Sequence, residues 1–143
     1  MRRIVALVIR AGLLCFAFSL VAQNPEAFQA RLSPVASDAR TRKDLAGIGT
    51  VTGSLAGSKL TIMGSFEGLR SSATVAQVRQ GVASGARGPA ILDLMVTKAA
   101  SGSISGSFDL TPPQVEALKK GRLYVQINSE NAKEGNLWGW LLP

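Results

Sequence analysis

From Phe28 onward, hydrophobic and polar residues alternate along most of the chain with the period of two that is typical of β-strands. The alternation predicts strands over residues 28–32, 48–55, 59–66, 74–80, 90–97, 103–110, 122–129 and 136–142. Residues 56–58 (Ala-Gly-Ser) predict a hairpin between the second and third of these. Eight short strands separated by turn residues indicate an all-β domain, and we expect an antiparallel β-sandwich or a barrel-like sandwich.

One segment carries the signals of a helix instead. Thr111 supplies a hydroxyl N-cap, Pro112 and Pro113 follow at the first helical positions, and Gln114 is a capping-box partner. Gly121 is a typical residue for the position after a helix. The sequence therefore predicts one short helix over about residues 112–120.

The first 22 residues follow a different pattern. Arg2 and Arg3 give a positive start, residues 11–22 are uniformly apolar or small, and polar residues follow from Gln23. This order is that of a secretory signal peptide. We expect residues 1–22 to be a signal peptide, residues 23–143 to form one domain, and the location to be extracytoplasmic, either periplasmic or secreted. The alternative is an uncleaved anchor over residues 4–22, where a central Arg10 costs about 2.5–3.5 kcal/mol on insertion scales.

Composition narrows the chemistry of that domain. Cleavage after residue 22 would remove three arginines and no acidic residue, so the net charge would fall from +7 to +4. The sequence has no histidine, and its one cysteine, Cys15, lies in the signal segment. We therefore expect no disulfide and no zinc or copper site, since those metals prefer histidine and cysteine ligands. We predict no cofactor.

Several segments in a fixed order carry a resemblance to a known family. They are Phe28–Leu32, Ala76–Gly81, Gly88–Leu94, Leu110–Gln114, Gly121–Ser129 and Gly135–Leu141. In this order they resemble the CHRD domain, named for chordin and common in exported bacterial proteins. The resemblance covers essentially the whole chain after the signal segment. It implies a β-sandwich with Greek-key character, and little activity, because the bacterial members largely lack an assigned one.

Three positions depart from the family pattern. Where the family often has histidine, this chain has Gln77, Arg79 and Asn128. An imidazole-based metal site or proton shuttle at these positions is therefore not available. Arg79 is a permanent cation, so it would repel a metal ion and would suit a carboxylate, a phosphate or a polar partner surface.

Neither catalysis nor nucleic-acid binding has a clear signature. A nucleophile needs a positioned base, and no motif selects one Ser–Lys pair among many. The glycine-rich segment 81–89 lacks a phosphate-loop lysine, so we expect a flexible connection between strands. The basic clusters at residues 40–43 and 119–122 are not interleaved with aromatic residues, and we expect solvated faces and no nucleic-acid partner.

The strongest anomaly is the last strand. Strand alternation places Asn136, Trp138 and Trp140 on one face, with Leu137 and Leu141 on the other. Exposed paired aromatic residues mark contact surfaces. The alternative is that both indoles pack over lysine or arginine side chains.

We therefore predict a partner-binding surface of Trp138, Trp140 and Asn136, with Arg79 and Asn128 as polar contributors. The predicted function is a non-enzymatic exported binding or assembly module that contacts a protein partner or an envelope component. One alternative is a small hydrolase or isomerase that uses Ser/Thr, Lys or carboxylate groups. The other is a membrane-anchored accessory subunit, which would contact the membrane only if residues 4–22 are retained.

Overall fold

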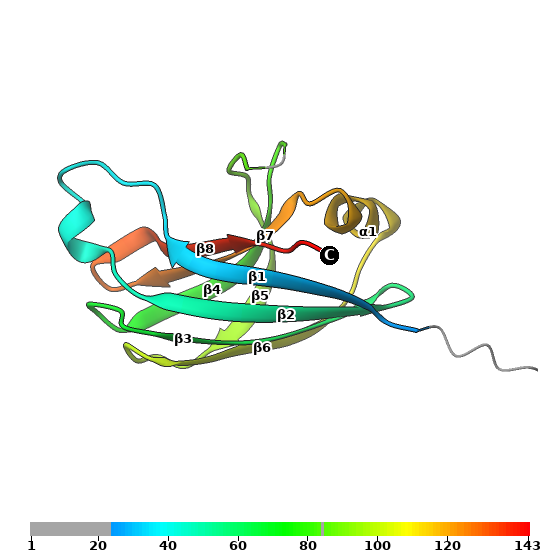
Figure 1. Ribbon diagram of the computed structural model, residues 1–143, viewed down its shortest axis with the longest axis horizontal. Helices are drawn as coiled ribbons and strands as arrows, with labels where there is room; N and C mark the ends of the chain where they lie inside the picture. The colour runs from blue at the N-terminus through cyan, green and yellow to red at the C-terminus, as the bar shows by residue number, and fades with distance from the viewer. Residues whose placement is uncertain (1–23, 84) are drawn as a thin grey trace, which may run out of the picture.

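Eight antiparallel strands and one short helix form the domain (Figure 1). The computed structural model describes residues 24–83 and 85–143. The strands are β1 (Glu26–Pro34), β2 (Ile48–Ala56), β3 (Lys59–Glu67), β4 (Ala73–Gln80), β5 (Ala90–Val96), β6 (Gly102–Asp109), β7 (Leu123–Ser129) and β8 (Ala132–Trp140). A 3-10 turn, η1 (Arg42–Asp44), lies between β1 and β2, and the helix α1 (Pro112–Lys119) lies between β6 and β7. The predictions of an all-β domain and of one short helix are confirmed.

The strands close into a barrel, in the order β1-β2-β3-β6-β5-β4-β7-β8 and back to β1. Two strands change partners along their length. β1 pairs first with β2 and then with β8 at Ser33 and Pro34. β5 pairs first with β4 and then with β6 at Met95 and Val96. The predicted β-sandwich is therefore wrong, because these two strands join both walls into one continuous sheet and leave no pair of separate sheets.

The seam between β1 and β8 depends on a close approach at Gly139. A Cβ atom at this position would lie 2.5 Å from the carbonyl oxygen of Arg31 and 3.0 Å from a methyl carbon of Leu32. Beside this contact, the backbone N–H of Gln29 donates to the carbonyl of Leu142 (2.7 Å), and the N–H of Leu142 donates to the carbonyl of Gln29 (3.0 Å). The absence of a side chain at Gly139 thus lets the first and last strands meet.

Alternating residues of every strand fill the barrel interior, as expected for strands that bury one face. Its largest fully buried apolar side chains are Phe28, Leu32, Leu60, Ile62, Ile104, Leu118, Leu123, Ile127, Leu137, Leu141 and Val51. These side chains form one core cluster, to which α1 contributes Ala117 and Leu118. The barrel is therefore a packed core that holds its outer faces in fixed positions.

The local signals for α1 are confirmed in detail. The Thr111 hydroxyl accepts a hydrogen bond from the backbone N–H of Gln114, and the Gln114 side chain accepts one from the backbone N–H of Thr111. Gly121 has a φ of 71°, a conformation that favours glycine. The helix begins and ends within one residue of its predicted bounds.

The predicted signal peptide, residues 1–22, lies outside the described residues. Signal cleavage and the extracytoplasmic location therefore stay predictions. Among the residues that the structure describes, no helix is long and apolar enough to cross a membrane.

Candidate functional site

Tyr124 lies at the centre of the outer face of the sheet formed by β4, β7 and β8. Its neighbours Leu123 and Val125 belong to the core cluster, so the Tyr124 ring lies on the opposite face of β7. The ring is nevertheless 0% exposed. Its hydroxyl donates to the carbonyl of Gly88 (3.1 Å), and accepts from the N–H of Gly88 (3.0 Å) and from Nε of Arg79 (3.2 Å). One donated and two accepted hydrogen bonds saturate the phenol. Because Tyr124 is fully buried on an outer face, other side chains and a loop must cover it.

The two tryptophans of β8 form part of that cover. The ring of Trp140 lies 4.5 Å from the Tyr124 ring, and the ring of Trp138 lies 5.8 Å from it at an interplanar angle of 87°. The two indoles are 6.1 Å apart. Both remain partly exposed. The three rings therefore form one cluster, in which the Tyr124 ring is buried underneath and the two indoles are partly exposed above it. Each aromatic pair contributes about 0.5–1.5 kcal/mol beyond the area that it buries.

Arg87 completes the cluster from the loop between β4 and β5. Its guanidinium lies over the Trp138 ring, 5.2 Å from the ring centroid, and the residue is exposed. A cation in this position is attracted by the negative face of the indole. The cluster therefore exposes an aromatic surface with a positive charge at one side.

The loop that carries Arg87 is held against the barrel at Gly88. A Cβ atom at Gly88 would lie only 1.7 Å from the carbonyl oxygen of Gln80, so no other residue fits this conformation. Both backbone groups of Gly88 bind the Tyr124 hydroxyl, and its carbonyl also accepts from Nε of Arg79 (2.9 Å). The expectation of a flexible connection is therefore wrong at this end of the segment, because the glycine permits a close contact that fixes the chain.

A polar strip runs beside the aromatic cluster, on β4, β5 and β7. Arg79 donates to the side-chain oxygen of Gln77 (3.1 Å), and Gln77 donates to the carboxylate of Asp93 (3.2 Å). On β7, Gln126 donates to the side-chain oxygen of Asn128 (2.9 Å), and Gln77 and Gln126 are direct cross-strand partners. The structure thus brings together the three positions at which the CHRD family often has histidine. Here amides and a guanidinium occupy them in two hydrogen-bonded groups, Arg79–Gln77–Asp93 and Gln126–Asn128.

Asn136 does not share the surface of the tryptophans. Its side chain is 0% exposed and donates to the hydroxyl of Ser129 (2.9 Å), while its Oδ1 atom has no hydrogen-bond partner. The pairing of β7 with β8 shifts register between Ile127 and Ser129, and Gly135 has a φ of 136°. Strict alternation fails at such an irregularity, which is why the sequence placed Asn136 beside Trp138.

Comparison with known proteins agrees with the motif order in the sequence. The family model for the CHRD domain matches residues 28–141, from within β1 to just past the end of β8. The chain belongs to the CHRD domain family. No curated protein and no solved structure matches this CHRD chain. In the part of the CHRD domain that the structure describes, no group of three or more His, Cys, Asp or Glu residues is placed to hold a metal ion.

Of the five residues predicted for a partner surface, four lie on the outer face of β4, β7 and β8. Trp138, Trp140 and Asn128 are partly exposed there, while Arg79 directs its hydrogen bonds toward protein groups and serves mainly to position Gly88. Sequence reasoning missed Tyr124 and Arg87. The alternation of β7 could have placed Tyr124 on this face, but nothing in the sequence of the loop shows that Arg87 packs on an indole.

Proposed function

We propose that this CHRD domain is a non-enzymatic exported binding module, and that its contact surface is formed by Trp138, Trp140 and Arg87. The observation that supports this proposal best is the pair of partly exposed indoles on a fully buried Tyr124. A rigid aromatic surface loses little side-chain entropy when a partner covers it, and tryptophan and arginine are enriched at the centres of protein interfaces.

The partner that this surface suits is a protein or an envelope component with an apolar contact and a negative or polar group beside it. The guanidinium of Arg87 lies over one indole and is exposed, so a carboxylate of the partner could pair with it without moving the aromatic rings. The hydrolase or isomerase and the membrane-anchored subunit stay alternative predictions, since no described contact selects either.

The experiment is affinity purification of the tagged protein from its own host after mild crosslinking, followed by mass spectrometry. Wild type is compared with Trp138→Ser/Trp140→Ser and with Arg87→Glu. Because the indoles cover Tyr124, the double variant must first be shown to be folded by circular dichroism. Arg87→Glu reverses the exposed charge and leaves all three rings in place, so it tests the surface without uncovering the tyrosine.

Met63→Glu is the matched control. Met63 is 64% exposed on β3, in the wall opposite β4, β7 and β8, so the change adds a carboxylate to a different outer face. The proposal expects one stoichiometric partner with wild type and Met63→Glu, and its loss with both site variants. Recovery of the same partner with all four proteins would refute the surface, and recovery of the monomer alone with all four would refute the binding function.

A further inference from the structure

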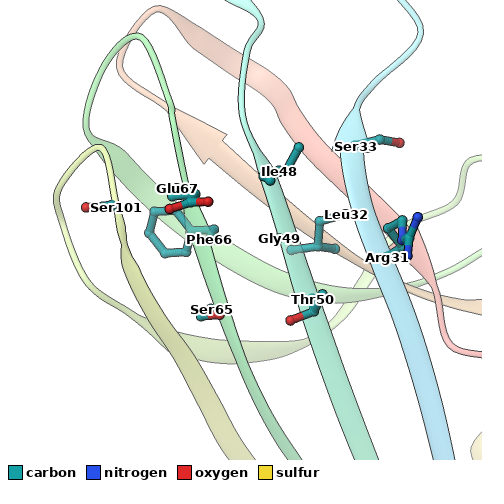
Figure 2. A pocket seen from close by; sticks show the side chains of 10 residues that line it. All are labelled: Arg31, Leu32, Ser33, Ile48, Gly49, Thr50, Ser65, Phe66, Glu67 and Ser101. Atoms are coloured by element: carbon teal, nitrogen blue, oxygen red, sulfur yellow. The ribbon is translucent and has the colours of Figure 1, made fainter.

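A groove of about 550 Å³ crosses the outer face of β1, β2 and β3 (Figure 2). It borders the aromatic cluster at Ser33, whose cross-strand partner on β8 is Trp138. Its centre is a block of two residues from each strand. Arg31, Thr50 and Ser65 are cross-strand neighbours in one row, and Ile48 and Glu67 are neighbours in the next. Ser33 of β1 lies beside Ile48 in Figure 2 and completes that second row. The volume is within the range of small-ligand sites.

Opposite charges occupy two diagonal corners of the block. Arg31 and Glu67 are both exposed. The ion pairs among the described residues, Lys119–Glu26 and Lys120–Glu116, involve neither of them. Two strand spacings of about 4.8 Å and one two-residue step of about 6.8 Å place their Cα atoms about 12 Å apart. Arg31 and Glu67 therefore lie on opposite sides of the groove, and each charged side chain is accessible to a bound molecule.

The positions between the two charges are uncharged. Hydroxyl groups come from Ser33, Thr50 and Ser65, with Ser101 at the far side of the groove. None of these four hydroxyls makes a hydrogen bond within the part of the chain that the structure describes. Each can therefore donate to a carbonyl or accept from an N–H of a bound molecule. Ile48 is 60% exposed at the middle and supplies an apolar contact.

We propose that this groove binds a short peptide with free ends, lying across the strands with its carboxylate at Arg31 and its ammonium group at Glu67. The guanidinium recognises a carboxylate with two parallel hydrogen bonds, and the carboxylate of Glu67 accepts from the ammonium group. At 3.3–3.6 Å per residue, extended peptides of two and three residues span about 7 and 10 Å. A hydrogen bond of about 2.9 Å at each end brings these spans to about 13 and 16 Å. The long side chains of Arg31 and Glu67 can reach over both lengths from Cα atoms about 12 Å apart. The groove borders the proposed partner surface at the Ser33–Trp138 pair, but Arg31 and Glu67 do not belong to that surface, and the peptide site does not depend on it.

The test is a titration of the isotope-labelled protein with trialanine, followed by amide chemical shifts in low salt at pH 7. The same titration is run with trialanine acetylated at its N-terminus only, with trialanine amidated at its C-terminus only, and with trialanine blocked at both ends. We expect shifts at residues of β1, β2 and β3 that line the groove, and about two- to fivefold weaker binding for each end that is blocked, the range of exposed ion pairs. Alanine and hexa-alanine should bind more weakly than trialanine.

Three variants separate charge recognition from general surface effects. Arg31→Gln and Glu67→Gln should each weaken trialanine to the level of the peptide blocked at the matching end. Lys59→Gln is the control, since Lys59 is exposed at the other end of β3 and should leave the affinity unchanged. The double exchange Arg31→Glu/Glu67→Arg should bind trialanine within about twofold of wild type, with its direction reversed.

Equal shifts for the free peptide and the peptide blocked at both ends would overturn the proposal, as would the absence of groove shifts at 50 mM trialanine. A double exchange that remains as weak as the single variants, in a protein with a wild-type amide spectrum, would also overturn it. Because the partner experiment changes Arg87, Trp138 and Trp140 and leaves Arg31 and Glu67 in place, either proposal can fail without the other.

Discussion

The substitution Tyr124→Phe, which removes one oxygen atom, tests whether the hydrogen bonds of Tyr124 stabilise the outer face of β4, β7 and β8. The phenol of Tyr124 is fully buried and makes three hydrogen bonds, to the N–H and the carbonyl of Gly88 and to Arg79. The phenylalanine ring keeps the packing against both indoles, because the substitution changes no ring atom. The loss therefore measures the hydrogen bonds alone.

The magnitude follows from the partners that remain. A neutral hydrogen bond contributes about 0.5–1.5 kcal/mol net, so the two bonds with Gly88 contribute about 1–3 kcal/mol. The third is less costly to lose, because Nε of Arg79 still donates to the carbonyl of Gly88 at 2.9 Å. We expect the free energy of unfolding to fall by about 2 kcal/mol, a large part of the roughly 5–15 kcal/mol that is typical of a domain.

Urea denaturation followed by tryptophan fluorescence measures this change. Thr52→Val is the matched control, since the exposed Thr52 hydroxyl makes one weak bond, 3.3 Å, to the carbonyl of Met63. The control should lose less than about 0.5 kcal/mol, as is usual for a surface change. Trypsin should also cut faster after Arg87 in Tyr124→Phe, because Gly88 is released. The reasoning would be refuted if Tyr124→Phe lowered the free energy of unfolding no more than Thr52→Val does, with the same dependence of that free energy on urea concentration in both proteins.

Three further predictions concern the fold. Gly139→Ala should destabilise the protein by about 1–3 kcal/mol in thermal or urea unfolding, because its Cβ would lie 2.5 Å from the carbonyl oxygen of Arg31; an unchanged midpoint would contradict this. Thr111→Ala should cost about 1 kcal/mol by removing the N-cap, and Thr111→Ser should restore most of it. The backbone N–H of Thr41 is the main group that holds the pKa of Asp38 below its ordinary value of 3.8. The stability from Asp38 is thus present above that ordinary value and lost as the pH falls through the lower folded pKa. A carboxyl titration by NMR with a midpoint at or above 3.8 would contradict it.

Local signals were sufficient where the interaction is local. The capping box of Thr111 and Gln114 joins residues three apart, so the sequence contains the whole interaction. Strand faces were predictable for the same reason, because alternation depends only on neighbouring residues. Trp138 and Trp140 therefore lie on the outer face that the pattern indicated.

The barrel was not predictable from the pattern, because closure depends on which strands pair. The exchange of partners within β1 at Ser33 and within β5 at Met95 leaves the alternation unchanged. Asn136 was misplaced because the irregular register near Gly135 interrupts the alternation. The role of Arg87 depends on a loop folding back over a distant strand, and no periodic signal records such a contact.

The most direct test of the proposed contact surface is site-specific photocrosslinking in the native host. A photoreactive amino acid replaces Val82 in one protein and Met63, on the opposite wall, in another. Val82 is 77% exposed and follows Gly81, where a Cβ atom would lie 2.9 Å from the Trp140 ring, so the probe sits beside the aromatic cluster and leaves its residues in place. The account predicts a discrete adduct of one mass from position 82 and none from position 63. No adduct from position 82, or the same adducts from both positions, would contradict the claim that the aromatic face is where this protein binds.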